Sequence, residues 1–242
     1  MENKMRIRRT LTVALLLVMA VLVGVFLWTG HEVRAQLHEY QAARSEYAQL
    51  RERFGIVGSV TSLPEDADSE ESLNFDALLV LNPGIVGWIV VPGTEISYPI
   101  VQGTDNERYL WHTISGERNN SGAIFLDYRN AVDFSDPLTI VYGHNMRDGS
   151  MFAPLHGWDG DYFIVHTPCG TMLFEVFDRQ LVQENDALYQ LCHAPRDNGA
   201  WVVMLSTCVF VQSHLRYVIR GRLWDKFEVL TKWRFLRQRS QN

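Results

Sequence analysis

Cys208 is the residue of this sequence with the clearest capacity for covalent chemistry. It follows an apolar, strand-like run at residues 201–207, and the end of a strand is where a rigid scaffold presents a side chain to a loop. A cysteine thiol has an ordinary pKa of about 8.5 and becomes a useful nucleophile beside a base or a cation. Without such a neighbour, a cysteine in this context is more often a buried packing residue.

Two other predicted strand ends supply the base and the cation. His144 follows the run 138–142 and stands beside Gly143; its imidazole titrates near neutrality and suits a general acid or base. Arg216 opens the run 217–223, and its permanently charged fork of donors can hold a carbonyl or an oxyanion. The plainer interpretations are a hydrogen-bonding loop histidine and a solvated surface arginine. The chemical interpretation therefore requires a fold that brings three strand ends together.

The chain after residue 73 has the pattern of an all-β domain. Short runs rich in Val, Ile, Phe, Tyr and Trp alternate with turn residues, which is typical of strands. The predicted strands are residues 87–91, 97–101, 123–126, 138–142, 162–167, 172–182, 201–207 and 217–223. A short helix is expected at 75–81, with helical turns at 107–112 and 151–155. Many short strands with few helices predict a sandwich or a closed barrel.

Several ordered motifs resemble the sortase family, and more narrowly its class B. They are Asn82-Pro83, Gly87-Trp88, Pro92-Gly93-Thr94, Tyr98-Pro99, Phe125-Leu126-Asp127-Tyr128-Arg129, Tyr142-Gly143-His144-Asn145-Met146, Leu205-Ser206-Thr207-Cys208 and the strand that begins at Arg216. Each motif is short, but together they follow the family order across residues 74–223. The loop at residues 183–200 is shorter than the insertion usual in class B.

The resemblance implies an all-β dominated fold, namely an eight-stranded sortase-type barrel with short helices. It implies a thioester formed on Cys208, proton transfer by His144 and carbonyl or oxyanion binding by Arg216. Substrate contacts are expected from three further residues, Thr207, Ser206 and Asn145. No metal or organic cofactor is implied. The expected partners are secreted proteins with a C-terminal sorting signal and an amine acceptor from a peptidoglycan precursor or a pilin.

The N-terminal third predicts a membrane anchor and a stalk. Residues 1–10 are basic, and residues 11–29 are an apolar run close to the ~20 residues that a spanning helix needs. The positive-inside rule then places the N-terminus in the cytoplasm and the catalytic domain, residues 73–225, outside the cell. A cleaved signal peptide is the alternative, but Val33-Arg34-Ala35 is a poor cleavage site. Residues 30–72 are expected to form a helical stalk followed by an acidic linker.

Charge and cysteine content exclude some classes of protein. A net charge of −6 argues against a general nucleic-acid binder, which needs a basic face. The basic tail at 226–242 is best interpreted as a solvated terminus. Three cysteines leave at least one free thiol, and a Cys169–Cys192 bridge stays open.

Three alternatives compete with a transpeptidase. The first is a hydrolytic cysteine peptidase, since water and amines both attack thioesters. The second is a non-catalytic, membrane-tethered β-domain that binds a partner, for which Cys208 would be dispensable. The third is a metal site built from histidines, but the spacings match no compact ligand motif; the candidates are His112, His144, His156 and His166. Asp127 is the nearest carboxylate to the site motifs and is expected to shape a turn.

Overall fold

The computed structural model describes residues 2–54, 73–193, 200–209 and 212–224. Contacts along the chain divide it into a unit of residues 1–42 and a unit of residues 43–242. The predicted acidic linker and the basic C-terminal tail lie outside the described residues, so both stay predictions.

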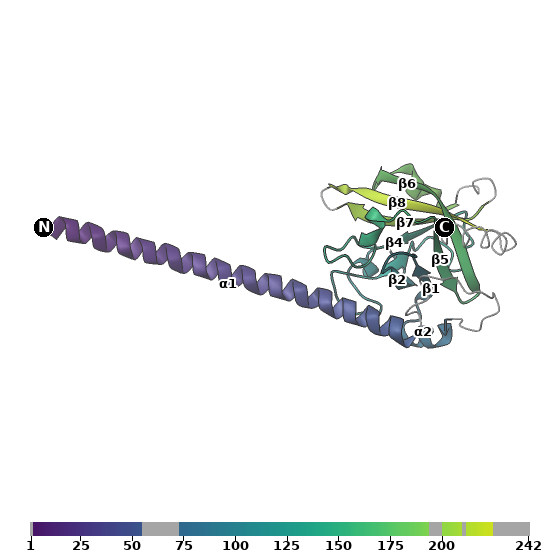
Figure 1. The fold of residues 1–242 in the computed structure, drawn as a ribbon, viewed down its shortest axis with the longest axis horizontal. Helices are drawn as coiled ribbons and strands as arrows, with labels where there is room; N and C mark the ends of the chain where they lie inside the picture. The colour runs from purple at the N-terminus through teal and green to yellow at the C-terminus, as the bar shows by residue number, and fades with distance from the viewer. Residues whose placement is uncertain (1, 55–72, 194–199, 210–211, 225–242) are drawn as a thin grey trace, which may run out of the picture. The chain divides into compact units, whose positions relative to one another are not determined.

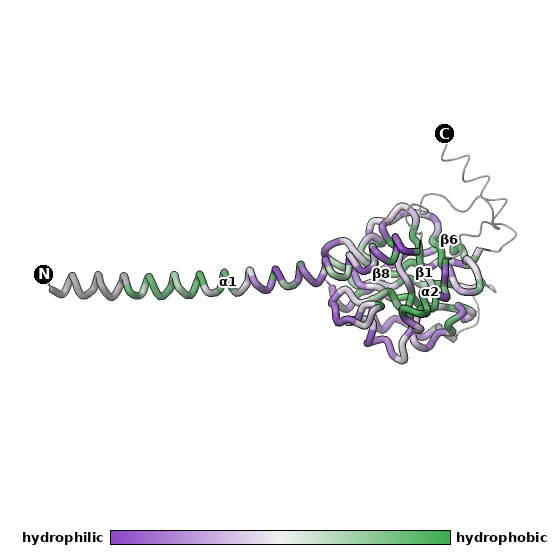
Figure 2. Tube along the Cα trace, turned by 90° about the horizontal axis from the view of Figure 1, so that it is seen from below, coloured by the Kyte–Doolittle hydropathy of each residue, from purple (hydrophilic) through white to green (hydrophobic). Residues whose placement is uncertain are grey.

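The N-terminal part of the chain forms one helix, α1 (Glu2–Arg53). The expected anchor and stalk are continuous within it, and Figure 2 shows its hydrophobic stretch giving way to a more hydrophilic one. By length and composition, α1 is able to cross a membrane. A signal sequence near an N-terminus passes the same test.

Eight strands close into a barrel, which resolves the choice between sandwich and barrel (Figure 1). They are β1 (Ile85–Val90), β2 (Ser97–Gln102), β3 (Ile124–Leu126), β4 (Leu138–Tyr142), β5 (Tyr162–Thr167), β6 (Gly170–Gln183), β7 (Val202–Val209) and β8 (Gln212–Leu223). Their order around the barrel is β1-β2-β3-β4-β7-β8-β6-β5. Helix α2 (Phe75–Leu81) precedes β1, and Asn74 caps its N-terminus by accepting from the Ala77 N–H at 3.0 Å.

The pairing that matters for the site joins β4, β7 and β8. β4 and β7 are parallel neighbours although a long stretch of chain separates them. β8, the last of the described strands, is antiparallel to both β7 and β6 and lies between them. Parallel strands end at the same edge, so the segments that follow β4 and β7 start from one end of the barrel.

Strand β7 is buried on both faces from Val202 to Thr207. Alternate side chains point to opposite faces of a strand, so one set belongs to the barrel interior. The other set packs under the short helix η4 (Ala187–His193). This second cluster comprises Leu138, Ile140, Val182, Tyr189, Val202, Met204 and Val218. It fixes the relative positions of β4, β7 and β8 immediately below the candidate site.

Two strand boundaries differ from the sequence prediction in a way that affects the site. β7 continues through Cys208 to Val209, and β8 begins at Gln212. Both Cys208 and Arg216 therefore lie within paired strands, where ladder hydrogen bonds fix their backbones. The helical turn expected at 107–112 is the shorter η2 (Arg108–Leu110), and the one expected at 151–155 is η3, shifted to Ala153–Gly157.

Candidate active site

The register of β4, β7 and β8 places Cys208 opposite Arg216 and next to the end of β4, which His144 follows. Cys208 is directly opposite Arg216 in the β7–β8 ladder. On the other side of β7, Tyr142 is opposite Ser206, and the Gly143 N–H extends this ladder to the Ser206 carbonyl at 3.1 Å. His144 is the next residue, so it leaves β4 beside Cys208. Neighbouring strands lie about 4.8 Å apart, and the nucleophile candidate is on the middle strand of the three.

Cys208 and Arg216 also share one face of the sheet. Met204 is paired with Ile140 on one side and with Arg220 on the other. Residues paired across strands point to the same face, and the face repeats every second residue. Cys208 and Arg216 therefore extend the face of the cluster under η4, beyond the point where Tyr189 covers it. The Cys208 side chain is partly exposed and its thiol is free.

The His144 ring is held by one backbone carbonyl. Its Nε2 lies 2.8 Å from the Leu110 oxygen. Since a carbonyl oxygen only accepts, Nε2 carries the proton, and Nδ1 is the basic nitrogen. Burial lowers the pKa of His144 below its ordinary value, and the hydrogen bond to Leu110 partly offsets this effect. The imidazole is therefore neutral at physiological pH and able to accept a proton.

Arg216 is oriented by a carboxylate that the sequence analysis missed. Its Nη2 donates to Glu184 Oε2 at 2.9 Å, and its Nη1 donates to the Leu215 carbonyl at 3.1 Å. The Arg216 side chain is 23% exposed, whereas that of Glu184 is 56% exposed. The pairing of Val182 with Arg216 brings the end of β6 alongside β8. The role of Glu184 could therefore be inferred only from the pairing of β6 with β8, which a single sequence does not reveal.

Two polar side chains meet at the backbone carbonyl of Cys208. Asn145 Nδ2 donates to this oxygen at 2.9 Å, and His156 Nε2 lies 3.0 Å from it. The His156 ring stacks on Tyr217 with 4.9 Å between ring centroids. The sequence analysis considered His156 only as a metal ligand. An open groove borders the same carbonyl, lined by parts of the 145–149 loop, Ala153, His156 and Val209.

The two residues before Cys208 are buried. Ser206 and Thr207 are each 1% exposed, and the Ser206 hydroxyl bonds the Tyr189 hydroxyl at 2.7 Å. The Thr207 hydroxyl is buried without a hydrogen-bond partner, on the face of β7 opposite Cys208. A substrate contact by either hydroxyl would need this cover to move, and their predicted substrate role stays a prediction. Asn145, by contrast, lines the open groove.

Asp127 has the structural role that the sequence analysis expected. It is fully buried and accepts from Arg129 Nε and Nη2 at 2.8 Å each. The hydroxyl of Tyr142 and the amide of Asn106 donate to its second oxygen at 3.0 and 3.1 Å. Although burial opposes ionisation, these hydrogen bonds hold the pKa of Asp127 below its ordinary value. The Asp127 carboxylate thus stabilises the turn after β3 and the position of Tyr142 on β4.

The described residues contain no group of three or more His, Cys, Asp or Glu side chains arranged to hold a metal ion. Cys169 is a free, exposed thiol at the β5–β6 turn.

Comparisons with known proteins agree with the geometry. A model of the sortase domain matches residues 89–224. Sortase B of Listeria monocytogenes is 37% identical over 147 residues, which are 60% of this chain and 58% of that protein. Sortase B of Staphylococcus aureus is 30% identical over 154 residues, covering 64% of this chain and 59% of that protein. The matched regions are thus less than two thirds of each relative.

Among solved structures, sortase B of Bacillus anthracis in complex with AAEK1 superimposes with a TM-score of 0.60 and 29% identity. The match covers 78% of this chain and 100% of that one. The eight-stranded barrel and the resemblance stated from sequence motifs are both confirmed. The chain belongs to the sortase family, and its relatives are class B sortases.

Proposed function

We propose that this chain is a membrane-anchored cysteine transpeptidase that cleaves a C-terminal sorting signal of secreted proteins. The acyl part of the cleaved protein is transferred to an amine of a cell-wall precursor or a pilin. The observation that supports this most is the strand register: Cys208 is opposite Arg216 on one side and beside the exit of His144 on the other. Family membership makes this chemistry the first to test.

In the first half of the proposed reaction, Cys208 Sγ attacks the scissile carbonyl carbon while its proton passes to His144 Nδ1. The carbonyl oxygen becomes an oxyanion, which Arg216 stabilises through donors held in a fixed plane. The carbon–nitrogen bond then breaks. The departing amine takes the proton from His144, and a thioester remains on Cys208.

In the second half, an acceptor amine attacks the thioester carbon and gives a proton to His144. A new amide bond forms, the carbon–sulfur bond breaks, and the sulfur recovers its proton. Water in place of the amine would give hydrolysis by the same steps. The balance between amine and water is therefore a matter of access to the thioester rather than of a different mechanism.

The proposed location follows from α1. Its length and composition suit a single membrane span, and the basic residues before it favour a cytoplasmic N-terminus. The barrel would then face the outside, where sorting signals and cell-wall precursors become available.

The test compares the full chain with Cys208→Ala in detergent micelles, using a library of sorting-motif peptides with and without an amine acceptor. We expect the parent protein to cleave a sorting-motif peptide and to form a peptide–amine product when the acceptor is present. A folded Cys208→Ala protein should form neither product. Cleavage without any amine product would favour the hydrolytic peptidase. Equal turnover by Cys208→Ala would exclude a cysteine mechanism altogether.

A further inference from the structure

The last turns of α1 belong structurally to the barrel unit. Residues 43–53, here called the stalk end, fall in the same contact unit as the strands. Tyr47 is 2% exposed and Ala43 is 3% exposed, although they lie on a helix whose earlier residues are largely exposed. Polar contacts fasten this segment to the barrel: Arg51 Nη1 donates to the Glu95 carbonyl at 3.0 Å, and Glu46 accepts from the Ser115 N–H at 3.2 Å.

Tyr47 supports the carbonyl that holds the His144 ring. The Tyr47 hydroxyl donates to the Gly122 carbonyl at 2.8 Å. Gly122 has a positive φ of 57° and packs so closely that a Cβ there would clash with the carbonyls of Tyr109 and Leu110. The Leu110 carbonyl is the acceptor for His144 Nε2. A shift of Gly122 would therefore displace the Leu110 carbonyl, which accepts the hydrogen bond from His144 Nε2.

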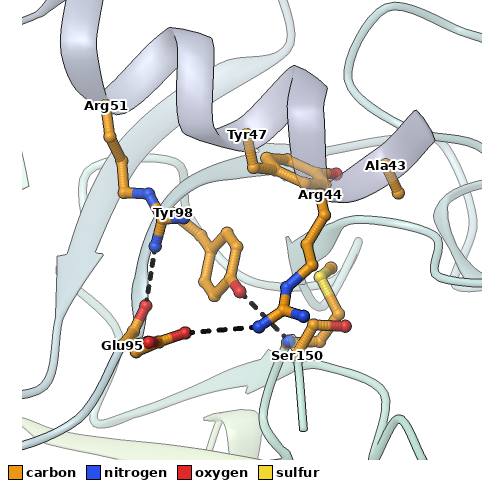
Figure 3. Close-up of a pocket in the computed structure, with 8 residues that line it drawn as sticks. Ala43, Arg44, Tyr47, Arg51, Glu95, Tyr98 and Ser150 are labelled. Atoms are coloured by element: carbon orange, nitrogen blue, oxygen red, sulfur yellow. Dashed lines mark hydrogen bonds and ion pairs between the residues drawn. The ribbon is translucent and has the colours of Figure 1, made fainter. Parts of the chain in front are cut away.

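Tyr47 also supports the backbone of the loop that carries His144. Its ring meets that of Tyr98 edge to face, with 5.2 Å between centroids. The Tyr98 hydroxyl accepts from the Met151 N–H at 3.2 Å, a contact drawn in Figure 3 together with the stalk end. Met151 is 1% exposed and bridges to Asn145.

The conformation of Met151 shows that this part of the loop is held under constraint. Met151 has a φ of 57°, which a non-glycine residue adopts at a cost of about 1–3 kcal/mol when its surroundings enforce it. The next residue, Phe152, donates its N–H to the His144 carbonyl at 2.8 Å. The loop is thus closed on itself at 144–152 and fastened to the barrel at the Tyr98 hydroxyl.

We infer that Tyr47 is a positioning residue for His144, acting through Gly122 and Leu110 on the ring and through Tyr98 and Met151 on the loop. The inference rests on the proposed function, because it gives His144 the proton-transfer role. It makes the stalk end part of the catalytic machinery rather than a spacer. Two sets of contacts support His144, one at its ring and one at its loop, and both lead to Tyr47. General packing of a helix against a barrel does not require this.

The experiment uses the full chain in detergent micelles, with Tyr47→Phe, Tyr47→Ala and the control Leu37→Ala. Leu37 is on the same helix and 54% exposed. Hydrogen exchange of residues 143–152 is measured by mass spectrometry, and kcat and KM are measured for peptide cleavage. We expect at least tenfold faster exchange in Tyr47→Ala, a kcat reduced at least tenfold and a KM within twofold of the parent. Tyr47→Phe keeps the ring contact but loses the Gly122 bond, so a smaller loss of kcat is expected; Leu37→Ala should match the parent.

Unchanged exchange at 143–152 in a Tyr47→Ala protein that melts as a single species would overturn the inference. If Tyr47→Ala does not fold, Tyr47→Phe decides: parental kcat and parental exchange in that variant would also overturn it. His144→Ala is measured in parallel. Full turnover by His144→Ala would refute the proposed role of His144, whereas the exchange rates would still decide whether Tyr47 holds the loop.

Discussion

At the residue scale, the nucleophile candidate is fixed through its own backbone. Two side chains lie within hydrogen-bond distance of the Cys208 carbonyl oxygen: Asn145, next to His144, and His156, in η3. Asn145 Nδ2 and His156 Nε2 also lie 3.0 Å apart. In the tautomer with a proton on Nε2, His156 donates to the same oxygen as Asn145, and each should then substitute in part for the other. Such hydrogen bonds contribute about 0.5–1.5 kcal/mol each.

A double-mutant cycle tests this redundancy. We expect Asn145→Ala and His156→Ala each to lower kcat/KM by no more than about threefold, or ~0.7 kcal/mol. The double variant should lose more than the product of the two single losses, since the carbonyl is then unsupported. Losses that multiply simply would show that the two side chains act independently.

Arg216 carries the second residue-scale prediction. Its planar fork of donors reaches Glu184 through Nη2 and the Leu215 carbonyl through Nη1. A single ammonium cannot reproduce that geometry, so Arg216→Lys should lower kcat more than tenfold. Glu184→Gln keeps a hydrogen-bond acceptor and should cost less than Arg216→Lys. Steady-state turnover of Arg216→Lys within about threefold of the parent would argue against oxyanion binding by this residue.

At the element scale, the exit from β4 has no room for a side chain. A Cβ at Gly143 would lie 2.5 Å from Ile124 Cδ1 and 2.6 Å from Phe152 Cδ2. Gly143→Ala should therefore reduce the free energy of unfolding by about 1–3 kcal/mol, as overpacking usually does. The matched control is Gly157→Ala, where nothing lies within 4 Å of the added atom. Thermal unfolding of the two variants, with equal melting temperatures as the contrary outcome, provides the measurement.

The sequence predicted strands well where a run of apolar, β-favouring residues was bounded by turn residues. The strands at 138–142 and 162–167 agree with β4 and β5 in both boundaries. Agreement fails at β8, which already includes the mostly polar residues 212–216, although their composition does not favour a strand. Tertiary pairing decides such a segment, and local propensity carries little information there. The same limit explains why Arg216 was expected to open the strand instead of lying inside it.

At the scale of the whole molecule, two partly buried histidines, His144 and His166, predict the effect of pH on stability. Burial lowers the pKa of His166 to about 4 and also lowers that of His144. The unfolded chain takes up these protons near pH 6.5, whereas the folded protein resists them. The contribution of these groups is therefore complete above about pH 6.5 and is lost as the pH falls towards 4.

Chemical denaturation at a series of pH values measures this dependence. We expect the free energy of unfolding to decline from pH 6.5 to pH 4, and His166→Gln to decline less steeply over the same interval. Below this window, protonation of Asp127 should add a further loss, because its pKa is lowered in the folded state. A parental profile that is flat between pH 6.5 and 4 would contradict the assignment.

The site as a whole was predictable only through the order of its motifs. Cys208, His144 and Arg216 were chosen for their chemistry and their places at strand ends; the register pairs Cys208 with Arg216 and places Cys208 next to the end of β4, which His144 follows. Their catalytic roles remain predictions. The sequence analysis gave no role near the site to Glu184, His156 or Tyr47. Their contacts depend on the strand order, on the position of η3 and on the packing of residues 43–53 against the barrel. No local pattern in a single sequence encodes contacts of that range.

The place of β8 has a consequence for biosynthesis. It is the last of the described strands to be synthesised, yet it lies between β6 and β7 and places Arg216 opposite Cys208. A nascent chain that lacks residues 212–223 can neither complete the cylinder nor present the cation. The candidate site is therefore assembled only after the chain has been synthesised through residue 223, and a chain that stops before residue 212 has Cys208 without its cationic neighbour.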